Sequence, residues 1–305
     1  MRAATFNVNG IRAAHRRGFA SWLETGDADV VALQEVRCRP EDLPDNAFGD
    51  YHVAYDPGQQ AGRNGVALLT RRPPARVFTW TADNPWSNQG RLIGVDLAEV
   101  PVTVLSVYVP KGGLPRQIAP ADGGRESYTP AQNHARYQNK MAFLAHFAAE
   151  LDALAAAAEA GGRSLLVMGD YNIAHGPADI HNWAGNLASE GFLPGERAWL
   201  DGAIGLAASR DRLRGRRIVA PNKRWRRLDH PLVDVVRSLH VDADGPYSWW
   251  SWQGQAFAKD VGWRIDYQLA SPPLAITATR AWVDRAAAAE QRVSDHAAVV
   301  VDYAI

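Results

Sequence analysis

Cysteine is almost absent from this chain of 305 residues, in which Cys38 is the only one. A single thiol excludes a disulfide framework within the chain and a cysteine-rich zinc site. It fits a reducing compartment such as the cytoplasm. Cys38 lies between Arg37 and Arg39 in an expected surface loop, with no histidine nearby in sequence. We therefore interpret it as an incidental thiol and not as a nucleophile.

Net charge and long apolar runs are also lacking. The formal net charge is +0, so no global basic field marks a polyanionic partner, although a neutral total can conceal local patches. No apolar run approaches the roughly 20 residues that a membrane span needs. The alanine-rich stretch 151–160 is short and carries Asp152 and Glu159. No basic and then apolar leader precedes the first strand-like segment, so we expect neither a signal peptide nor a membrane span.

What the chain does contain is a large apolar fraction in alternating segments. Hydrophobic residues make up 47% of the sequence, which is ample for a large core. Helical patterns cover residues 15–25 and 131–160, and Gly161 and Gly162 end the second. Strand-like runs occur at 30–35, 64–70, 92–97 and 102–107. Because no linker or repeat interrupts this alternation, we predict one α/β domain over residues 1–305.

The most informative segment runs from Leu165 to His175, where an apolar run ends in Gly169, Asp170 and Asn172. Apolar runs bounded by glycine predict buried strands, and open α/β sheets bind ligands beyond their strand ends. The i, i+2 spacing places Asp170 and Asn172 on one side of an extended chain. An acid beside an amide there suits the activation of a water molecule. A turn is the alternative, because both residue types are common in turns.

The same pattern, in which polar residues adjoin an apolar run, recurs along the chain. The polar residues are Asn7 and Asn9 after residues 3–6, Glu35 after 30–33, Tyr108 after 102–107, Asp266 within 264–269, and Asp295 and His296 before 297–301. Turn chemistry alone does not predict so many acids, amides and a histidine at strand ends. We therefore expect them to meet at one edge of a sheet.

These groups have a consistent chemical sense. Carboxylates such as Glu35 are hard oxygen ligands for Mg²⁺ or Mn²⁺, and one histidine without cysteine ligands argues against structural zinc. Asp266 beside His296 would fix the imidazole tautomer and stabilise its protonated form. Protonated His296 and the Tyr108 hydroxyl could both contact a phosphate. Asp170 could take a proton from the attacking water, a contribution of about 10²–10⁴-fold. Together they predict metal-assisted hydrolysis of a phosphoester.

Each group also has an ordinary structural explanation. Glu35 could be solvated, and Tyr108 could be a core tyrosine with a wet hydroxyl. Asp266 could pair with Arg264 or with a backbone amide. His296 could cap the final strand. Their joint occurrence in this order is harder to explain by chance, which favours the catalytic interpretation.

Six motifs carry a resemblance to a known family. They lie at residues 7–12, 33–35, 107–110, 169–172, 262–267 and 294–296. In this order they resemble the exonuclease III family of abasic-site endonucleases, within the endonuclease/exonuclease/phosphatase superfamily. The sequences Gly-Asp-x-Asn at 169 and Asp-His at 295 are shared across that superfamily. The motifs at 7–12, 172–175 and 262–267 are more specific to the exonuclease III branch.

The resemblance implies a fold, a reaction and a partner. The fold would be a DNase I-like four-layer α/β sandwich, with two mixed sheets and helices outside. The cofactor would be Mg²⁺ or Mn²⁺, and the substrate double-stranded DNA with abasic sites or blocked 3′ ends. The enzyme would hydrolyse the phosphodiester 5′ to an abasic site and act as a 3′→5′ exonuclease and 3′-end phosphatase or phosphodiesterase. It implies a bacterial, cytoplasmic, nucleoid-associated enzyme without an obligatory protein partner.

The resemblance also assigns roles to residues of this chain. The implied metal site comprises Asn7, Glu35, Asp170, Asn172, Asp295 and His296. The implied catalytic groups are Tyr108, Asp170, Asn172, Asp266 and His296. The implied DNA contacts are Asn9, Arg12, Lys111, Asn172, Trp249, Trp263 and His296. Tryptophan is mostly buried, but Trp249, Trp263 and Ile265 would here line a pocket for an extruded baseless sugar.

Two features depart from the family pattern. Lys111 stands where members usually carry Asn or Gln, and it could contact a DNA phosphate or disturb the neighbouring loop. Residues 205–230 look like a basic insertion, which could contact DNA or be a solvated arm. Its basic residues are Arg210, Arg212, Arg214, Arg216, Arg217, Lys223, Arg224, Arg226 and Arg227.

Two other classes of protein are alternatives. A superfamily phosphatase or sphingomyelinase, acting on small phosphoesters or lipids, would share Glu35, Asp170, Asn172 and His296. It would not need the motif at 262–267, the tryptophans or the basic segment. A non-catalytic DNA-binding protein with the same fold is the second alternative, against which the intact acids and His296 argue.

Overall fold

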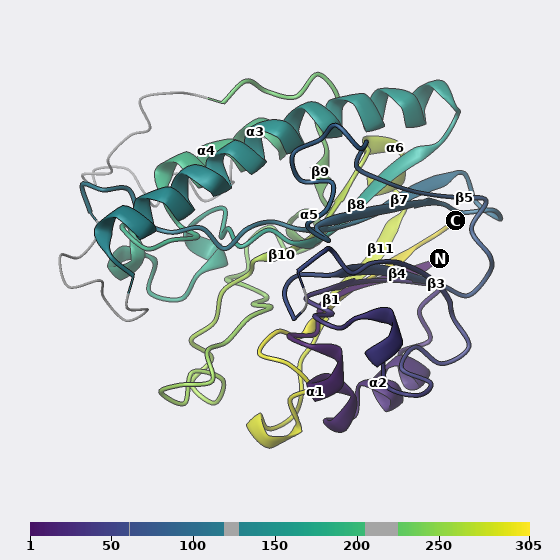
Figure 1. The fold of residues 1–305 in the computed structure, drawn as a ribbon, viewed down its shortest axis with the longest axis horizontal. Helices are drawn as coiled ribbons and strands as arrows, with labels where there is room; N and C mark the ends of the chain where they lie inside the picture. The colour runs from purple at the N-terminus through teal and green to yellow at the C-terminus, as the bar shows by residue number, and fades with distance from the viewer. Residues whose placement is uncertain (61, 119–127, 205–224) are drawn as a thin grey trace.

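Two mixed sheets of six strands each form the centre of the molecule. The structure, a computed structural model, describes the chain apart from residue 61 and residues 119–127 and 205–224, drawn as a grey trace in Figure 1. The first sheet has the order β11 (Ala278–Asp284), β12 (Ala298–Tyr303), β1 (Arg2–Asn7), β2 (Val30–Gln34), β4 (Val66–Thr70) and β3 (His52–Asp56). The second has the order β5 (Arg76–Thr79), β6 (Leu92–Asp96), β7 (Val102–Tyr108), β8 (Ser164–Asp170), β10 (Asp266–Ala270) and β9 (Val233–Asp234).

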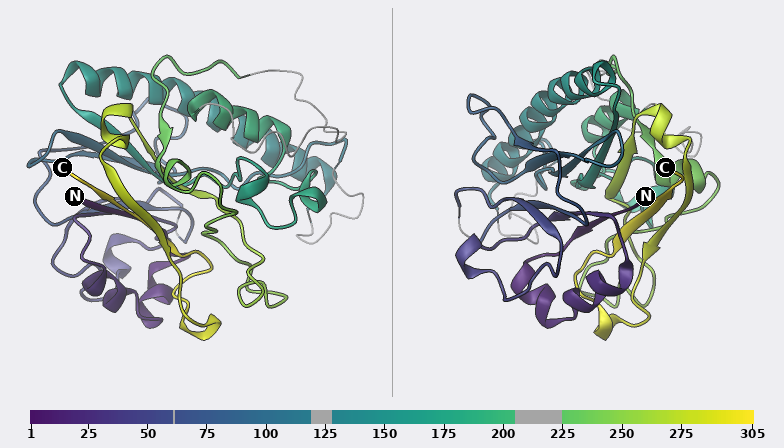
Figure 2. Two further views of the ribbon diagram at one scale, coloured as in Figure 1. Left: turned by 180° about the vertical axis from the view of Figure 1, so that it is seen from behind. Right: turned by 90° about the vertical axis from the view of Figure 1, so that its right-hand side faces the viewer.

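Helices cover the outer face of each sheet. Helices α1 (Ile11–Arg16) and α2 (Phe19–Gly26) lie outside the first sheet, and α3 (Pro130–Ala160) and α4 (Pro194–Ile204) lie outside the second (Figure 1). Figure 2 shows the same layers from behind and from the side. Shorter helical segments are α5 (Val235–Leu239), α6 (Pro272–Ala275), η1 (Pro40–Asp42), η3 (Pro177–Asp179), η4 (Trp183–Asn186) and η6 (Ala289–Gln291).

Three apolar layers hold the stack together, as burial of both faces of each sheet requires. Between the sheets, Leu68 of β4 belongs to the same buried cluster as Met168 of β8. On the outer side of the first sheet, Phe19 of α2 shares a cluster with Leu33 of β2. On the outer side of the second, Phe143 of α3 shares a third cluster with strands β7 and β8. The predicted four-layer α/β sandwich is therefore confirmed.

The expected helix at residues 15–25 is two helices. Helix α1 begins earlier, at Ile11, and ends at Arg16, whereas α2 begins at Phe19. Gly18 between them has φ 98°, a left-handed conformation that interrupts a right-handed helix and that glycine adopts at little cost. The chain turns at this glycine, and Phe19 and Leu23 of α2 are buried.

Helix α3 is an exception to the expectation that no segment is long and apolar enough to span a membrane. Among the described residues it is the one helix long and apolar enough to do so by length and composition, a test that core helices also pass. Its residues Phe143, Leu144, Phe147 and Leu151 are buried in the cluster beside the second sheet. Its apolar side is therefore covered by the protein itself.

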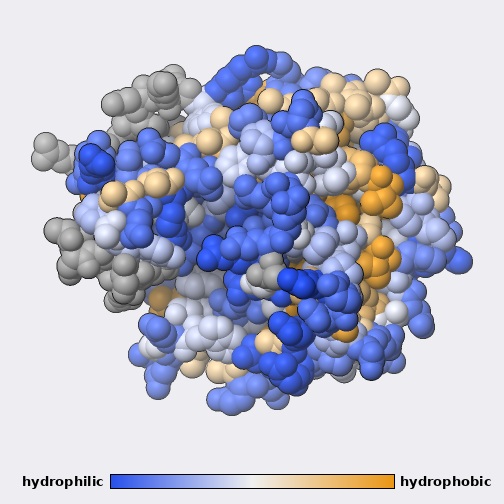
Figure 3. All heavy atoms as spheres, in the orientation of Figure 1, coloured by the Kyte–Doolittle hydropathy of each residue, from blue (hydrophilic) through white to orange (hydrophobic). Residues whose placement is uncertain are grey.

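Exposed apolar side chains are scattered. Examples are Val53 on β3 and Val77 on β5, with 45% and 52% of their surface exposed. The face drawn in Figure 3 is otherwise largely hydrophilic, with small apolar areas toward the right of the view.

Candidate active site

Strand pairing brings the predicted polar residues to one edge of the two sheets. Strands β1 and β2 are parallel with Asn7 opposite Gln34, so Asn7 and the following Glu35 end at the same edge. Strands β7 and β8 are also parallel, with Tyr108 opposite Asp170. Strand β10 runs antiparallel to β8, which places its first residue, Asp266, opposite Asp170. The directions of these strands therefore place residues that are far apart in sequence at the same edge.

Asn7 connects the two sheets at this edge. Its side-chain Nδ2 donates to Glu35 Oε1 at 3.1 Å and to Asp170 Oδ2 at 2.9 Å. All three side chains are buried. Two carboxylates that share one amide donor form an electronegative site of oxygen ligands, the set that Mg²⁺ and Mn²⁺ favour. The carboxylates of Glu35 and Asp170 therefore fit a hard divalent cation. Asn7 faces them with its N–H group, because its Oδ1 accepts from the backbone N–H of Asn9 at 3.0 Å.

Asp170 is held by the residue two positions further on. Asn172 adopts a left-handed conformation with φ 51°, which lets its backbone N–H donate to Asp170 Oδ1 at 2.8 Å. Its Nδ2 donates to the carbonyl of Val109 at 3.0 Å and to Asp170 Oδ2 at 3.3 Å. Burial, reinforced by the charges of Asp266 and Glu35, raises the pKa of Asp170 to about 7, although His296 and the Asn172 N–H oppose the shift. A carboxyl poised near neutrality suits proton transfer.

His296 lies between two carboxylates. Its Nδ1 is 2.8 Å from Asp266 Oδ2, and its Nε2 is 3.9 Å from Asp170 Oδ2. The Ser248 hydroxyl also donates to Asp266 Oδ2, at 2.6 Å. Burial alone would lower the pKa of His296, but Asp266 and Asp170 outweigh it and raise the pKa to about 10. The imidazole is therefore held as a cation with its Nε2 toward Asp170.

Tyr108 is a buried phenol that stays protonated. Burial and the nearby charges of Glu35 and Asp170 raise its pKa well above the ordinary value. The guanidinium of Arg91 lies 5.0 Å from the centre of the Tyr108 ring and donates to the backbone carbonyl oxygen of Tyr108 at 2.9 Å. The ring is thus fixed, and its neutral hydroxyl forms a hydrogen bond with the side chain of Glu35.

Asp295 lies in a network on the side of the tryptophans. Its carboxylate accepts from Asn9 Nδ2 at 2.8 Å and from Trp249 Nε1 at 3.1 Å. Burial opposes ionisation, but His296 and these hydrogen bonds lower the pKa of Asp295 overall. Trp249 and Trp263 meet edge to face, with ring centres 6.2 Å apart. The structure therefore gathers these predicted residues at the site and joins Asp295 to Asn9 and Trp249.

One pocket of about 390 Å³ opens over this arrangement. It is lined by Asn9, Glu35, Arg37, Tyr108, Lys111, Asn172, Ser189, Glu190, Gly191, Trp249, Trp263, Ile265, Asp295 and His296. Of the predicted DNA contacts only Arg12 does not line it; Arg12 is exposed on α1.

Sequence reasoning missed several lining residues. Arg37 forms an ion pair with Glu35 and donates to Asn9 Oδ1 at 2.7 Å. Its position two residues after Glu35, at the same strand end, could have indicated that it lies at the site. Glu190 pairs with Lys111 at 3.3 Å across the pocket rim. Nothing in the sequence near Glu190 marks it, because its loop reaches the site only through the fold. The basic segment 205–230 falls mostly outside the described residues.

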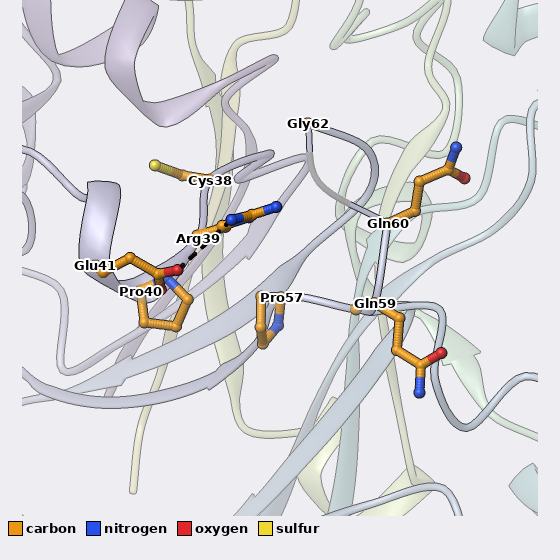
Figure 4. A pocket seen from close by; sticks show the side chains of 9 residues that line it. Cys38, Arg39, Pro40, Glu41, Pro57, Gln59, Gln60 and Gly62 are labelled. Atoms are coloured by element: carbon orange, nitrogen blue, oxygen red, sulfur yellow. Dashed lines mark ion pairs between the residues drawn. The ribbon is translucent and has the colours of Figure 1, made fainter.

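A second hollow of about 260 Å³ lies near Cys38 (Figure 4). The Cys38 side chain points away from Gln59 and Gln60 in this view, and its Sγ donates to the carbonyl of Asp42 at 3.1 Å. Burial raises the pKa of the thiol. A buried thiol with a raised pKa is a poor nucleophile, in agreement with its interpretation as incidental.

Several known proteins are similar to this chain over most of its length. Residues 4–296 match the model of the endonuclease/exonuclease/phosphatase family. The chain is 28% identical to an exodeoxyribonuclease of Bacillus subtilis (strain 168) over 90% of this chain and 89% of that protein. It is 26% identical to the DNA repair nuclease APEX1 of Danio rerio over 90% of this chain and 74% of that protein.

Solved structures share the fold over the whole length. An AP endonuclease from Archaeoglobus fulgidus superposes with a TM-score of 0.75 and 25% identity, and the match covers 100% of both chains. The 3′-5′ exonuclease NExo from Neisseria meningitidis superposes with a TM-score of 0.74 and 24% identity over 99% of both chains.

Proposed function

The chain belongs to the endonuclease/exonuclease/phosphatase family and is a nuclease of its exonuclease III branch; we propose that it repairs DNA by hydrolysing the phosphodiester 5′ to abasic sites. We further propose that it removes nucleotides from 3′ ends and clears phosphate or sugar fragments that block them. The observation that carries the proposal is Asp170, a buried acid with a pKa of about 7. The backbone N–H of Asn172 holds its carboxylate, and the His296 cation lies beside it.

Mg²⁺ or Mn²⁺ is the cofactor that these residues suit. Glu35 and Asp170 would hold it, with Asn7, Asn172, Asp295 and His296 around them. When bound, the cation would stabilise negative charge on the phosphate oxygens. The oxygen ligands and the absence of any second cysteine in the sequence favour these hard cations over zinc.

The chain's own residues then divide the work of hydrolysis. Asp170 accepts a proton as a water oxygen bonds to phosphorus and the bond to the leaving O3′ breaks. Asn172 keeps Asp170 in place through two hydrogen bonds. His296, with its cationic ring fixed by Asp266, and the neutral Tyr108 hydroxyl donate to the phosphate oxygens as charge develops there.

The tryptophan pair supports recognition of a baseless sugar. Trp249, Trp263 and Ile265 form the apolar part of the pocket lining. An apolar recess beside the catalytic groups would accept an extruded sugar, and extrusion costs least where no base pair exists. Asn9, Lys111 and the exposed Arg12 would contact the DNA backbone around the pocket.

The proposed partner is double-stranded DNA carrying abasic sites or blocked 3′ ends. No obligatory protein partner is proposed. The proposed place of action is the bacterial cytoplasm at the nucleoid, where the DNA lies. The Bacillus exodeoxyribonuclease among the relatives supports this location.

The test is nicking of a duplex that carries a single abasic-site analogue, in Mg²⁺. We expect cleavage by the wild type and a loss of at least about 10²-fold in Asp170→Asn and His296→Asn. An undamaged duplex of the same sequence measures the preference for abasic sites, which Trp249→Ala and Trp263→Ala should reduce. Absence of nicking by the wild type with every divalent cation would end the proposal. Hydrolysis of small phosphomonoesters without DNA cleavage would instead indicate a phosphatase.

A further inference from the structure

Helix α3 carries a lysine that is fully buried. The Lys140 side chain has 0% of its surface exposed, as has the Glu196 side chain on α4, and Nζ lies 2.7 Å from Glu196 Oε1. Lysine is almost never fully buried unless it is paired, because removing an ammonium from water costs several kcal/mol. A less costly residue could have filled this space, so the contacts of the ammonium itself need an explanation.

Those contacts lead to the active site. Lys140 Nζ donates to the carbonyl oxygen of Asn172 at 2.8 Å and to that of Lys111 at 3.1 Å. With the ion pair to Glu196, the ammonium has three oxygen partners. Asn172 lies in the loop after β8, and Lys111 lies in the loop after β7. One buried cation therefore joins the two loops that directly follow Tyr108 and Asp170.

We infer that Lys140 is a positioning residue for catalysis, which clamps the backbone of Asn172 and Lys111 so that Asn172 holds Asp170 in its reactive position. The inference rests on the proposed function, because Asp170 is the proposed base. Asn172 presents its N–H and its carboxamide to Asp170, and its carbonyl to Lys140. Its left-handed backbone, with φ 51°, is a conformation that asparagine adopts more readily than most residues other than glycine.

The loop after β7 is pressed onto the same helix. A Cβ atom on Gly112, which has φ +94°, would lie 2.7 Å from Lys140 Cδ, and one on Gly113 would lie 2.4 Å from the carbonyl oxygen of Asn133. These glycines let the backbone come close enough for the ammonium to reach the Lys111 carbonyl. Glu196 is held in turn, since its Oε2 accepts from the backbone N–H of Leu193 at 2.9 Å.

A purely structural role is the competing explanation. If the pair served only to join α3 to α4, Lys140 and Glu196 would be equivalent, and loss of either would act through stability alone. If Lys140 positions the loops, it differs from Glu196. Glu196→Gln leaves the two carbonyl contacts of the ammonium in place, whereas Lys140→Met removes them.

The experiment compares Lys140→Met, Glu196→Gln and the double variant Lys140→Met/Glu196→Gln on the abasic duplex in Mg²⁺. The double variant leaves no buried charge unpaired, which guards against failure to fold. We expect kcat to fall about 100-fold in both variants that lack Lys140, since a misplacement of about 1 Å can cost that much. KM and the Kd for DNA without metal should stay within about twofold, because no surface contact is lost. Glu196→Gln should keep kcat within about threefold.

Two controls separate the possible outcomes. Leu151→Ala, also buried on α3 and remote from both loops, shows what loss of stability alone does to kcat. Hydrogen–deuterium exchange of residues 108–114 and 170–176 gives a readout independent of activity, and it should accelerate in Lys140→Met but not in Glu196→Gln. Wild-type kcat in the double variant, or equal effects of the two single variants on exchange, would overturn the inference. If the wild type cleaves no DNA but Lys140→Met still exchanges faster than Glu196→Gln, the proposed function is refuted and the clamp is not.

Discussion

Two neighbouring residues of the active site, His296 and Asp170, hold a proton more tightly than isolated residues do. The pKa of His296 is about 10 against an ordinary 6.5, and that of Asp170 is about 7 against 3.8. For each group, protonation stabilises the folded state relative to the unfolded state. The associated stability is fully present below the unfolded pKa and is lost as the pH rises through the folded value.

We therefore expect the free energy of unfolding, without divalent cations, to fall as the pH rises from about 6.5 to about 10. His296→Asn should make this fall shallower, because the folded protein then lacks the proton that His296 binds. Denaturant unfolding across this range in EDTA measures the slope. His146→Asn, at an exposed site on α3, is the matched control and should keep the wild-type slope. An unchanged slope in His296→Asn would contradict the assignment of the imidazolium.

Asp170 also couples metal binding to proton release. With a pKa of about 7, its carboxyl is partly protonated near neutrality. A divalent cation bound beside it favours the carboxylate and should displace up to about one proton per cation. Isothermal titration of Mg²⁺ in buffers of different ionisation enthalpy counts these protons.

Asp170→Asn should release fewer protons than the wild type in that titration. Asp284→Asn should release as many, because Asp284 pairs with Trp22 Nε1 away from the site. Equal proton release in Asp170→Asn and in the wild type would mean that Asp170 does not hold the exchanging proton.

At the scale of elements, the end of strand β8 depends on close approach to β7. A Cβ on Gly169 would lie 1.9 Å from the carbonyl oxygen of Val107, its partner in the parallel ladder. Gly169→Ala must push the strands apart one residue before Asp170. We expect a loss of about 1–3 kcal/mol of stability together with a fall in kcat.

Thermal or denaturant unfolding of Gly169→Ala tests this, with Gly26→Ala as the control. A Cβ on Gly26, at the end of α2, would meet no other atom within 4 Å. That variant should be as stable as the wild type, or more stable by a few tenths of a kcal/mol, because alanine restricts the unfolded chain. A stable and active Gly169→Ala would show that the two strands can separate without cost.

The sequence predicted the elements that are buried on both faces. The apolar runs at 30–35 and 102–107 correspond to β2 and β7, and every residue of these strands is buried. The edge strand β5 was not expected, because Arg76, Val77 and Thr79 are exposed and break the apolar pattern. The single helix at 15–25 was a wrong prediction, because a pattern of apolar residues does not show the left-handed turn at Gly18.

At the scale of the whole molecule, the same distinction applies to the site. Asp170, His296 and Glu35 could be found because each adjoins an apolar run, and parallel strands end at the same edge. Lys140 could not, since a lysine within a helix usually faces water. Its burial depends on Glu196, on a different helix, and on two loop carbonyls. Local sequence thus predicts the groups that act on the substrate better than those that hold them.

The balance of charge over the molecule leads to the last prediction, which concerns the basic segment 205–230. The net charge is +0, so an arginine-rich stretch in a neutral protein would dominate its interaction with a polyanion if it lies against the DNA. Most of this segment, including Arg210 and Arg212, falls outside the described residues, and its role stays a prediction. Each phosphate contact contributes about 0.9 to the slope of log K against log salt.

We expect Arg210→Gln/Arg212→Gln to reduce the salt slope of duplex binding by about 0.9 for each contact that is lost. Fluorescence anisotropy over a range of salt concentrations, without metal, measures the slope. Arg72→Gln/Arg76→Gln removes the same charge near Glu99 and Asp96, at the edge opposite Tyr108. This control should keep the wild-type slope, because DNA at the active site lies across the molecule from it. Equal slopes for both double variants and the wild type would show that Arg210 and Arg212 contact no phosphate, and the segment would then be a solvated arm.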